Sequence, residues 1–172
     1  MQPGFPLLSL AIWVPMVAGV IVLATGSDRN AGAARVIALV GALLGFLVTL
    51  PLYFGFDPLA GGFQFVELAP WIDTFNVNYH LGIDGISLLL ILLNSFTTVL
   101  VVLAGWQVIQ SRVAQYMASF LFLSAFMNGV FCALDALLFY VFFEATLIPM
   151  FIIIGVWGGP KRVYAALKFF LY

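Results

Sequence analysis

The chain has 172 residues, of which 65% are apolar and only 8% carry a charged side chain. A soluble globular domain has about 25% charged residues, so this composition excludes the soluble enzyme classes, and its hydrophobicity excludes disorder. A net charge of −1 excludes an electrostatic nucleic-acid surface, and the single cysteine, Cys132, excludes an internal disulfide or a cysteine-rich zinc site. The composition predicts an all-α integral membrane protein.

Five apolar stretches are long enough to cross a bilayer, which takes about 20 residues in a helix. We expect these helices at about residues 5–25, 36–56, 86–105, 116–134 and 136–157. The last two come from one apolar stretch that, as a single helix, would be about 63 Å long. Because this is about twice the hydrocarbon thickness, we expect a break at Asp135, which is a favourable N-cap for the helix that follows.

The remaining segments are an outer loop and the end of the chain. Within residues 57–81, the runs Phe63–Leu68 and Phe75–His80 roughly alternate apolar and polar side chains, with Pro70 in the connection between them. This alternation predicts a short β-hairpin. After Gly158-Gly159-Pro160 an apolar run resumes and reaches Tyr172. We therefore expect residues 1–172 to form one truncated transmembrane domain, the N-terminal piece of a longer protein, with the start of a sixth helix.

The cations predict an orientation for these helices. All of them lie in connections or ends that this arrangement places on one side of the membrane: Arg29, Arg35, Arg112, Lys161, Arg162 and Lys168. Cytoplasmic connections carry an excess of Lys and Arg. The N-terminus is therefore predicted to be outside, with the cations on the cytoplasmic or matrix side.

Most charged residues have an ordinary structural explanation. Asp84 and Asp135 are each expected to cap the helix that follows. The other charged residues of the connections are expected to be solvated, and among them are Asp28, Arg29, Arg35, Asp57, Glu67, Asp73 and Arg112.

Glu144 differs because it lies about 12 Å inside the fifth expected helix, near the centre of an apolar layer of about 30 Å. A charge there costs at least about 2.5–3.5 kcal/mol on insertion scales. Its neighbours at helical spacing, Tyr140, Val141, Leu147 and Ile148, cannot neutralise it. An ionised Glu144 therefore needs a partner from a later helix or another subunit. Carboxylates inside a membrane are functional by default, so Glu144 is the candidate for proton exchange; the structural alternative is a protonated, hydrogen-bonded side chain.

The supporting candidates are the expected cap Asp135 and, on the same helix as Glu144, Pro149. Pro149 has no amide hydrogen, so the carbonyl of Ala145 loses its helical partner. A free carbonyl near a membrane carboxyl suggests local water or a helix irregularity, whereas the structural alternative is a kink for packing. The residues alone thus indicate either proton or cation transport or a structural subunit, and they contain no haem, phosphate-binding or CxxC motif.

Two motifs resemble a known family. These are His80-Leu-Gly-Ile-Asp-Gly-Ile-Ser87 and the run from Phe139 to Gly158, which contains Phe143-Glu144-Ala-Thr-Leu-Ile-Pro149-Met-Phe. Both resemble the antiporter-like membrane subunits of proton-pumping NADH:quinone oxidoreductase, respiratory complex I, of the type called chain M in bacteria and subunit 4 in mitochondria. The similarity is close from about Phe63 onward, and the first 60 residues match only in having two helices.

The resemblance implies a bundle of about fourteen helices in which the glutamate matching Glu144 is essential for proton pumping and pairs with a lysine beyond residue 172. It also implies that chains L and N are neighbours in the bacterial inner membrane (or the mitochondrial one). NADH, FMN, iron–sulfur clusters and quinone would then bind other subunits, with no cofactor or metal on this chain. The alternatives are a subunit of a multi-subunit Na⁺/H⁺ antiporter or membrane-bound hydrogenase, and a non-transporting structural or assembly protein.

Overall fold

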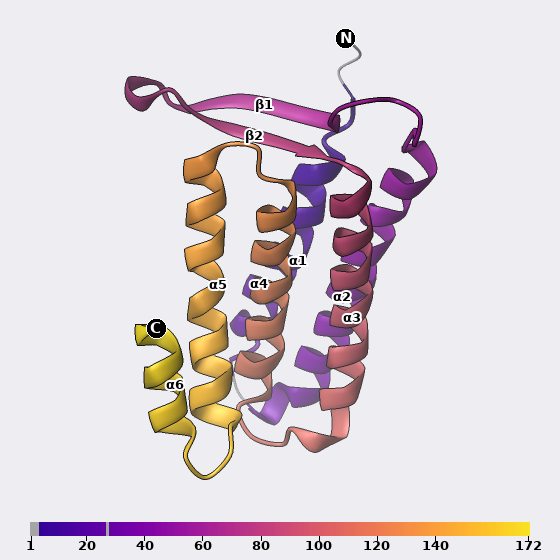
Figure 1. Ribbon diagram of the computed structural model, residues 1–172. Helices are drawn as coiled ribbons and strands as arrows, with labels where there is room; N and C mark the ends of the chain where they lie inside the picture. The colour runs from indigo at the N-terminus through magenta and orange to yellow at the C-terminus, as the bar shows by residue number, and fades with distance from the viewer. Residues whose placement is uncertain (1–3, 27) are drawn as a thin grey trace.

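The computed structural model describes residues 4–26 and 28–172. In this part of the chain, five apolar helices run side by side, and a β-hairpin lies across one end of the bundle (Figure 1). The helices are α1 (Leu7–Ala24), α2 (Ala31–Gly55), α3 (Gly85–Val108), α4 (Val113–Cys132) and α5 (Ala136–Trp157). A shorter helix, α6 (Arg162–Leu171), lies beside α5 at the end opposite the hairpin.

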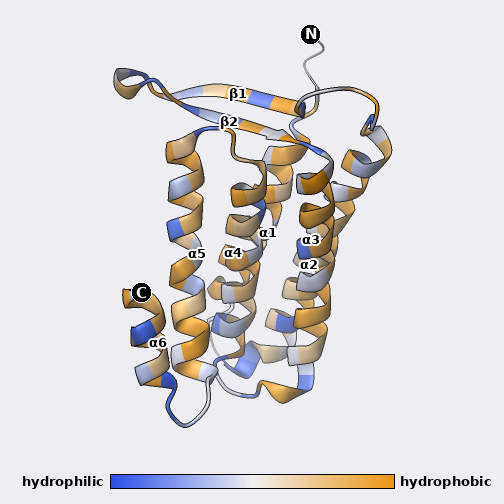
Figure 2. Cartoon of the chain, viewed as in Figure 1, coloured by the Kyte–Doolittle hydropathy of each residue, from blue (hydrophilic) through white to orange (hydrophobic). Residues whose placement is uncertain are grey.

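The five helices confirm the predicted all-α membrane fold. Figure 2 shows that they are mostly hydrophobic, with hydrophilic residues concentrated in the connections and the hairpin. α2 begins at Ala31, earlier than its expected start at residue 36, and α3 continues to Val108. Hydropathy marks only the apolar part of a helix, whereas the backbone hydrogen bonds continue into the polar ends.

Two carboxylates begin helices as predicted. The Asp84 side chain accepts a 2.7 Å hydrogen bond from the backbone N–H of Ser87 in the first turn of α3. Asp135 accepts from the N–H groups of Leu137 and Leu138, at 2.9 and 3.3 Å, in the first turn of α5. Both satisfy amides that have no partner inside the helix. As predicted, Asp135 lies at the break between α4 and α5.

The hairpin consists of β1 (Gln64–Ile72) and β2 (Val77–Ile83), which pair antiparallel around a 3₁₀ turn at Asp73–Phe75. The predicted hairpin is confirmed. The sequence analysis placed Pro70 in the connection between the strands, but Pro70 lies within β1. Proline is tolerated there because β1 is an edge strand and its pairing is irregular between Pro70 and Ile72.

The connection between α4 and α5 is bound to the hairpin. The N–H of Leu134 donates to the carbonyl oxygen of His80 at 2.8 Å, and Ala133 pairs with Leu81 as an isolated bridge. Since β2 leads directly into α3, the hairpin joins the ends of α3, α4 and α5 that lie beside it.

Glu67 corrects the expectation of a solvated loop carboxylate. It is half-buried, and its Oε2 accepts a 3.0 Å hydrogen bond from the backbone N–H of Ser9 as well as one from the Ser9 hydroxyl. The Ser9 hydroxyl also lies 3.1 Å from the Tyr79 hydroxyl. Because Ser9 is in the first turn of α1, the carboxylate of β1 lies at the positive end of that helix dipole.

At the opposite end of the bundle, Asp28 and Arg35 also make long-range contacts that the sequence analysis did not anticipate. The Asp28 carboxylate accepts from the N–H groups of Arg112 and Val113, both at 3.2 Å, and so caps α4 from a distant part of the chain. Arg35 donates to the carbonyl oxygen of Ile109 at 2.8 Å. Asp28 lies in the α1–α2 connection, whereas Arg35 lies within α2, which begins before its expected start. Together the bonds attach this end of α2 and the connection before it to the α3–α4 connection.

Candidate functional site

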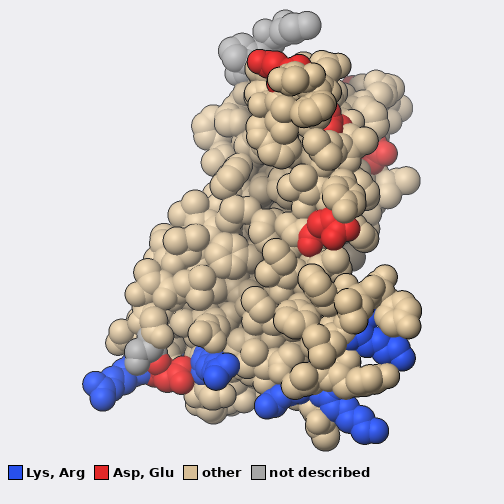
Figure 3. Space-filling model, turned by 90° about the vertical axis from the view of Figure 1, so that its left-hand side faces the viewer, with Lys and Arg blue, Asp and Glu red and all other residues tan. Residues whose placement is uncertain are grey.

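Glu144 is the ninth residue of α5, about 12 Å along the helix from its first residue. It is the only Asp or Glu within the five membrane-spanning helices. Its side chain is exposed on the surface of this chain. In Figure 3, Lys and Arg gather at one end of the molecule, where an acidic group also lies, and other acidic groups lie toward the opposite end and part of the way along an otherwise uncharged surface.

The packing of α5 determines the direction of Glu144. The buried residues of α5 are Leu138, Phe142 and Pro149, which lie on one stripe of the helix. At 3.6 residues per turn, Glu144 lies about 140° around the helix axis from this stripe. Its carboxyl group therefore points away from the core of this chain.

α5 has the least covered surface of the five spanning helices. In an apolar 18-residue stretch of each helix, 17% of the residues of α5 are buried, compared with 56% of those of α4. Glu144 has no hydrogen bond or ion pair with any residue in ranges 4–26 and 28–172. A partner for an ionised Glu144 would have to come from outside these residues.

The structure separates the three residues that the sequence analysis singled out. Pro149 is buried beside Ser119 and Phe122 of α4, at an apolar groove, on a different face of α5 from Glu144. Asp135 is at the hairpin end of α5, where it accepts a 3.2 Å hydrogen bond from the N–H of Asn78 in β2 in addition to its two cap bonds. α5 continues as one helix through Pro149.

The hydrogen bonds to Asp135 have an electrostatic consequence. The N–H of Asn78 in particular, together with those of Leu138 and Leu137 and the nearby His80, lowers the pKa of this carboxyl below its usual value of 3.8. Asp84 is similar, because the N–H of Ser87 lowers its pKa. Both groups are ionised caps near neutral pH, which agrees with a structural role at the hairpin end of the bundle.

A polar network inside the bundle was missed by the sequence analysis. The Asn94 amide of α3 donates to the Asn128 amide oxygen of α4 at 2.9 Å and to the carbonyl oxygen of Ser124 at 3.0 Å. Asn128 in turn donates to the carbonyl oxygen of Ala11 in α1 at 3.0 Å. Two asparagines within apolar spans were a visible signal, because polar side chains in membrane helices bond to neighbouring helices.

The C-terminal end of α5 is held by a tryptophan. The Trp157 indole N–H donates to the carbonyl oxygen of Ser111 at 3.2 Å, and its ring packs edge-on against Tyr116, with centroids 5.2 Å apart. α5 is thus attached at its N-terminal end by Asp135 and at its C-terminal end by Trp157.

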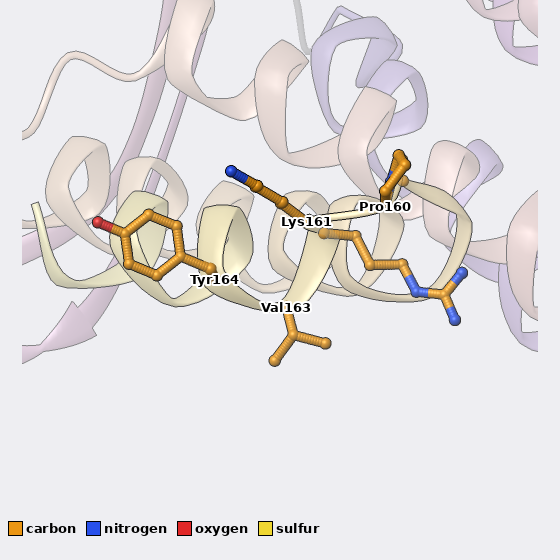
Figure 4. A pocket seen from close by; sticks show the side chains of 7 residues that line it. Pro160, Lys161, Val163 and Tyr164 are labelled. Carbon is orange, nitrogen blue, oxygen red and sulfur yellow. The ribbon is translucent and has the colours of Figure 1, made fainter.

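A hollow follows Trp157, in the connection to α6. It is lined by residues of one continuous stretch, Gly158 to Tyr164. Figure 4 shows that the side chains of Lys161, Val163 and Tyr164 diverge from one another, so they do not converge on a common ligand. Glu144 therefore remains the candidate group of this chain.

Two family models match the chain. Residues 59–134 match the family described as NADH-ubiquinone oxidoreductase chain 4, amino terminus. Residues 133–172 match the family described as NADH:quinone oxidoreductase/Mrp antiporter, TM. The two matches together run from the hairpin through α6 and include Glu144.

Curated relatives match almost the whole chain. It is 49% identical over 172 residues to NADH-quinone oxidoreductase subunit M of Rhodobacter capsulatus, with 96% of this chain and 32% of that protein covered. It is 45% identical over 166 residues to NADH-ubiquinone oxidoreductase chain 4 of Arabidopsis thaliana, with 96% of this chain and 33% of that protein covered. The chain therefore spans about a third of the length of these relatives.

The fold has a counterpart among solved structures. A chain of respiratory complex I from Thermus thermophilus with bound NADH matches with a TM-score of 0.80 and 30% identity, over 96% of this chain and 32% of that one. With its five membrane-spanning helices, the protein is a multi-pass protein of a bacterial or mitochondrial inner membrane. The family matches, the relatives and the fold agree, and the chain belongs to the family of NADH-quinone oxidoreductase subunit M and NADH-ubiquinone oxidoreductase chain 4.

Proposed function

We propose that this chain is part of a proton-translocating membrane subunit of NADH:quinone oxidoreductase, in which Glu144 exchanges protons at mid-membrane. The observation that carries the proposal is the position of Glu144, which is the single carboxyl within the five spans and is on the uncovered face of α5. Intramembrane carboxylates mark proton and ion pathways in transporters. The relatives named above support the same activity.

The proposed mechanism relies on a cationic partner. Electron transfer elsewhere in the complex changes the charge state of a lysine beyond residue 172, which then pairs with Glu144 or releases it. Pairing favours the ionised carboxylate and separation favours the protonated one. Alternation between the two states moves protons along a hydrated path. Pro149, through the free carbonyl of Ala145, is proposed to help hydrate that path.

The partners and orientation form part of the same proposal. We place this chain in the membrane arm, next to the antiporter-like chains L and N, with NADH, FMN, iron–sulfur clusters and quinone bound to other subunits. The concentration of Lys and Arg at the end opposite the hairpin supports an N-terminus on the outer side.

The experiment is Glu144→Gln in the complete protein within its complex. We expect normal assembly and loss of NADH-driven proton pumping in membrane vesicles, because glutamine keeps the shape but cannot exchange a proton. Asp73→Asn, which removes a carboxylate from the exposed hairpin turn, is the matched control and should pump normally. Normal pumping by Glu144→Gln would refute the proposal, and Glu144→Asp should retain part of the activity.

One observation favours a second candidate. The family model that covers Glu144 is named for both NADH:quinone oxidoreductase and the Mrp antiporter, so a subunit of a multi-subunit Na⁺/H⁺ antiporter is the alternative. Sodium flux in vesicles that depends on Glu144 but not on NADH would favour it. A purely structural or assembly role predicts that Glu144→Gln leaves every transport measurement unchanged.

A further inference from the structure

Gly129 of α4 packs directly against the ring of Phe142 of α5. A Cβ atom placed on Gly129 would lie 2.6 Å from both Cγ and Cδ1 of Phe142 and 2.7 Å from Cδ2. Favourable carbon–carbon contacts need about 3.5–4.0 Å. The phenylalanine ring therefore fits against Gly129 only because this residue has no side chain.

The atoms involved make this contact difficult to relax. They are at the base of the ring, next to the Phe142 backbone, so the ring cannot swing away from an added methyl group as the end of a long side chain could. Phe142 is 9% exposed and packs in the core cluster that contains Leu8, Ile91 and Cys132. An added Cβ would therefore displace the α5 backbone by about 1 Å or rotate the helix, to restore a contact of about 3.5 Å.

The α4 side of this contact is fixed. Asn128, the residue before Gly129, bonds both to Ala11 of α1 and to Asn94 of α3. Helix α4 is thus held by two neighbours at the turn where α5 packs against it. Because Phe142 packs against this fixed surface of α4, the contact determines the rotation of α5 about its own axis.

Glu144 follows Phe142 by two residues, so its direction depends on how Phe142 is seated. We propose that Gly129 and Phe142 are positioning residues that fix the rotation of α5 and thereby direct Glu144 toward its proton-exchange partner. This inference rests on the proposed function. It assigns a role to two apolar positions that touch neither the proton nor the carboxylate.

The test uses the complete protein in its assembled complex. Gly129→Ala adds the obstructing methyl group, and Phe142→Leu in the same chain removes the ring that it meets. Gly45→Ala is the control, because Gly45 is also a buried helical glycine, but a Cβ there would have ordinary contact with Pro15 at 3.7 Å. Three quantities are measured: the amount of assembled complex, protons pumped per NADH oxidised, and the rate at which dicyclohexylcarbodiimide modifies Glu144, read by mass spectrometry.

We expect Gly129→Ala to lower pumping and to change the modification rate of Glu144 by about threefold or more, since a shift of about 1 Å in a reacting group has effects of this size. The double variant should return both quantities to within about twofold of the unmodified protein, because the leucine makes room for the methyl group. Gly45→Ala should match the unmodified protein in all three measurements.

Unchanged pumping and modification in assembled Gly129→Ala would overturn the inference, and so would an assembled double variant that shows no recovery. If Gly129→Ala does not assemble, the single variant Phe142→Leu is the test. It removes the ring that packs against Gly129, so it should also change the modification rate of Glu144, and an unchanged rate would overturn the inference. The modification rate does not depend on pumping. Normal pumping by Glu144→Gln would therefore refute the proposed function while the carbodiimide measurement still decided the positioning role.

Discussion

Asn128 donates its side-chain amide to the carbonyl oxygen of Ala11, 3.0 Å away, and so joins α4 to α1 across 117 positions of sequence. Its amide oxygen accepts from Asn94 of α3 at 2.9 Å. One residue that is 1% exposed thus connects three membrane helices. Inside a bilayer no water replaces these bonds, so the network fixes how the three helices pack.

We predict that Asn128→Ala destabilises the complete protein by about 1 kcal/mol, given that hydrogen bonds between membrane helices average about 0.6 and reach about 1.7 kcal/mol. The measurement is an SDS unfolding titration of the purified chain. Thr49→Val is the control, because the buried Thr49 hydroxyl bonds only to Phe46 of its own helix. Equal stability of the two variants would show that the network contributes nothing between helices.

A second prediction concerns the cap that Asp28 provides to α4. Asp28→Ala should fray the first turn of α4, because the amides of Arg112 and Val113 lose their acceptor. Hydrogen exchange at these two amides should become faster, whereas Asp28→Asn should preserve much of the protection, since asparagine is also a good capping acceptor. The amides of Leu137 and Leu138, capped by Asp135, are the internal reference. Unchanged exchange at Val113 in Asp28→Ala would contradict the assignment.

A third prediction is a dependence on pH at the hairpin end of the bundle. The pKa of Asp135 is lowered in the folded chain, chiefly by the N–H of Asn78. A lowered folded pKa means that the stabilisation is present above the unfolded value of 3.8 and is lost as the pH falls through the folded pKa below it. The amide of Asn78 should therefore exchange faster as the pH is lowered from about 4 to 2, after correction for intrinsic exchange. Asp135→Asn should abolish this dependence, and Asp73→Asn should leave it unchanged.

The sequence predicted the features that depend on local chemistry. Spans follow from runs of apolar residues, and the caps at Asp84 and Asp135 follow from where an aspartate stands relative to such a run. The central depth of Glu144 required only its distance from Asp135 along the helix. None of these predictions needed knowledge of which helices are neighbours.

Features that depend on tertiary neighbours could not be predicted in this way. Glu67 was expected to be solvated, but its partner Ser9 is 58 residues away, and Asp28 meets Val113 across 85 positions. The fit of Phe142 on Gly129 requires the relative rotation of two helices, which no spacing rule supplies. Pro70 was placed in a turn because of proline's usual preference, although an edge strand also tolerates it.

The contacts of Asp28 and Arg35 with the α3–α4 connection also set an order of assembly during synthesis. Chains emerge from their N-terminus first, so α1 and α2 enter the membrane while Asp28 and Arg35 still lack the groups that they bind. Both residues remain hydrated until Ile109 and Val113 have been made. The end of the bundle opposite the hairpin therefore closes only once α3 has entered the membrane and the first turn of α4 has formed, and until then the paired first helices carry a charged surface whose partners have not yet been made.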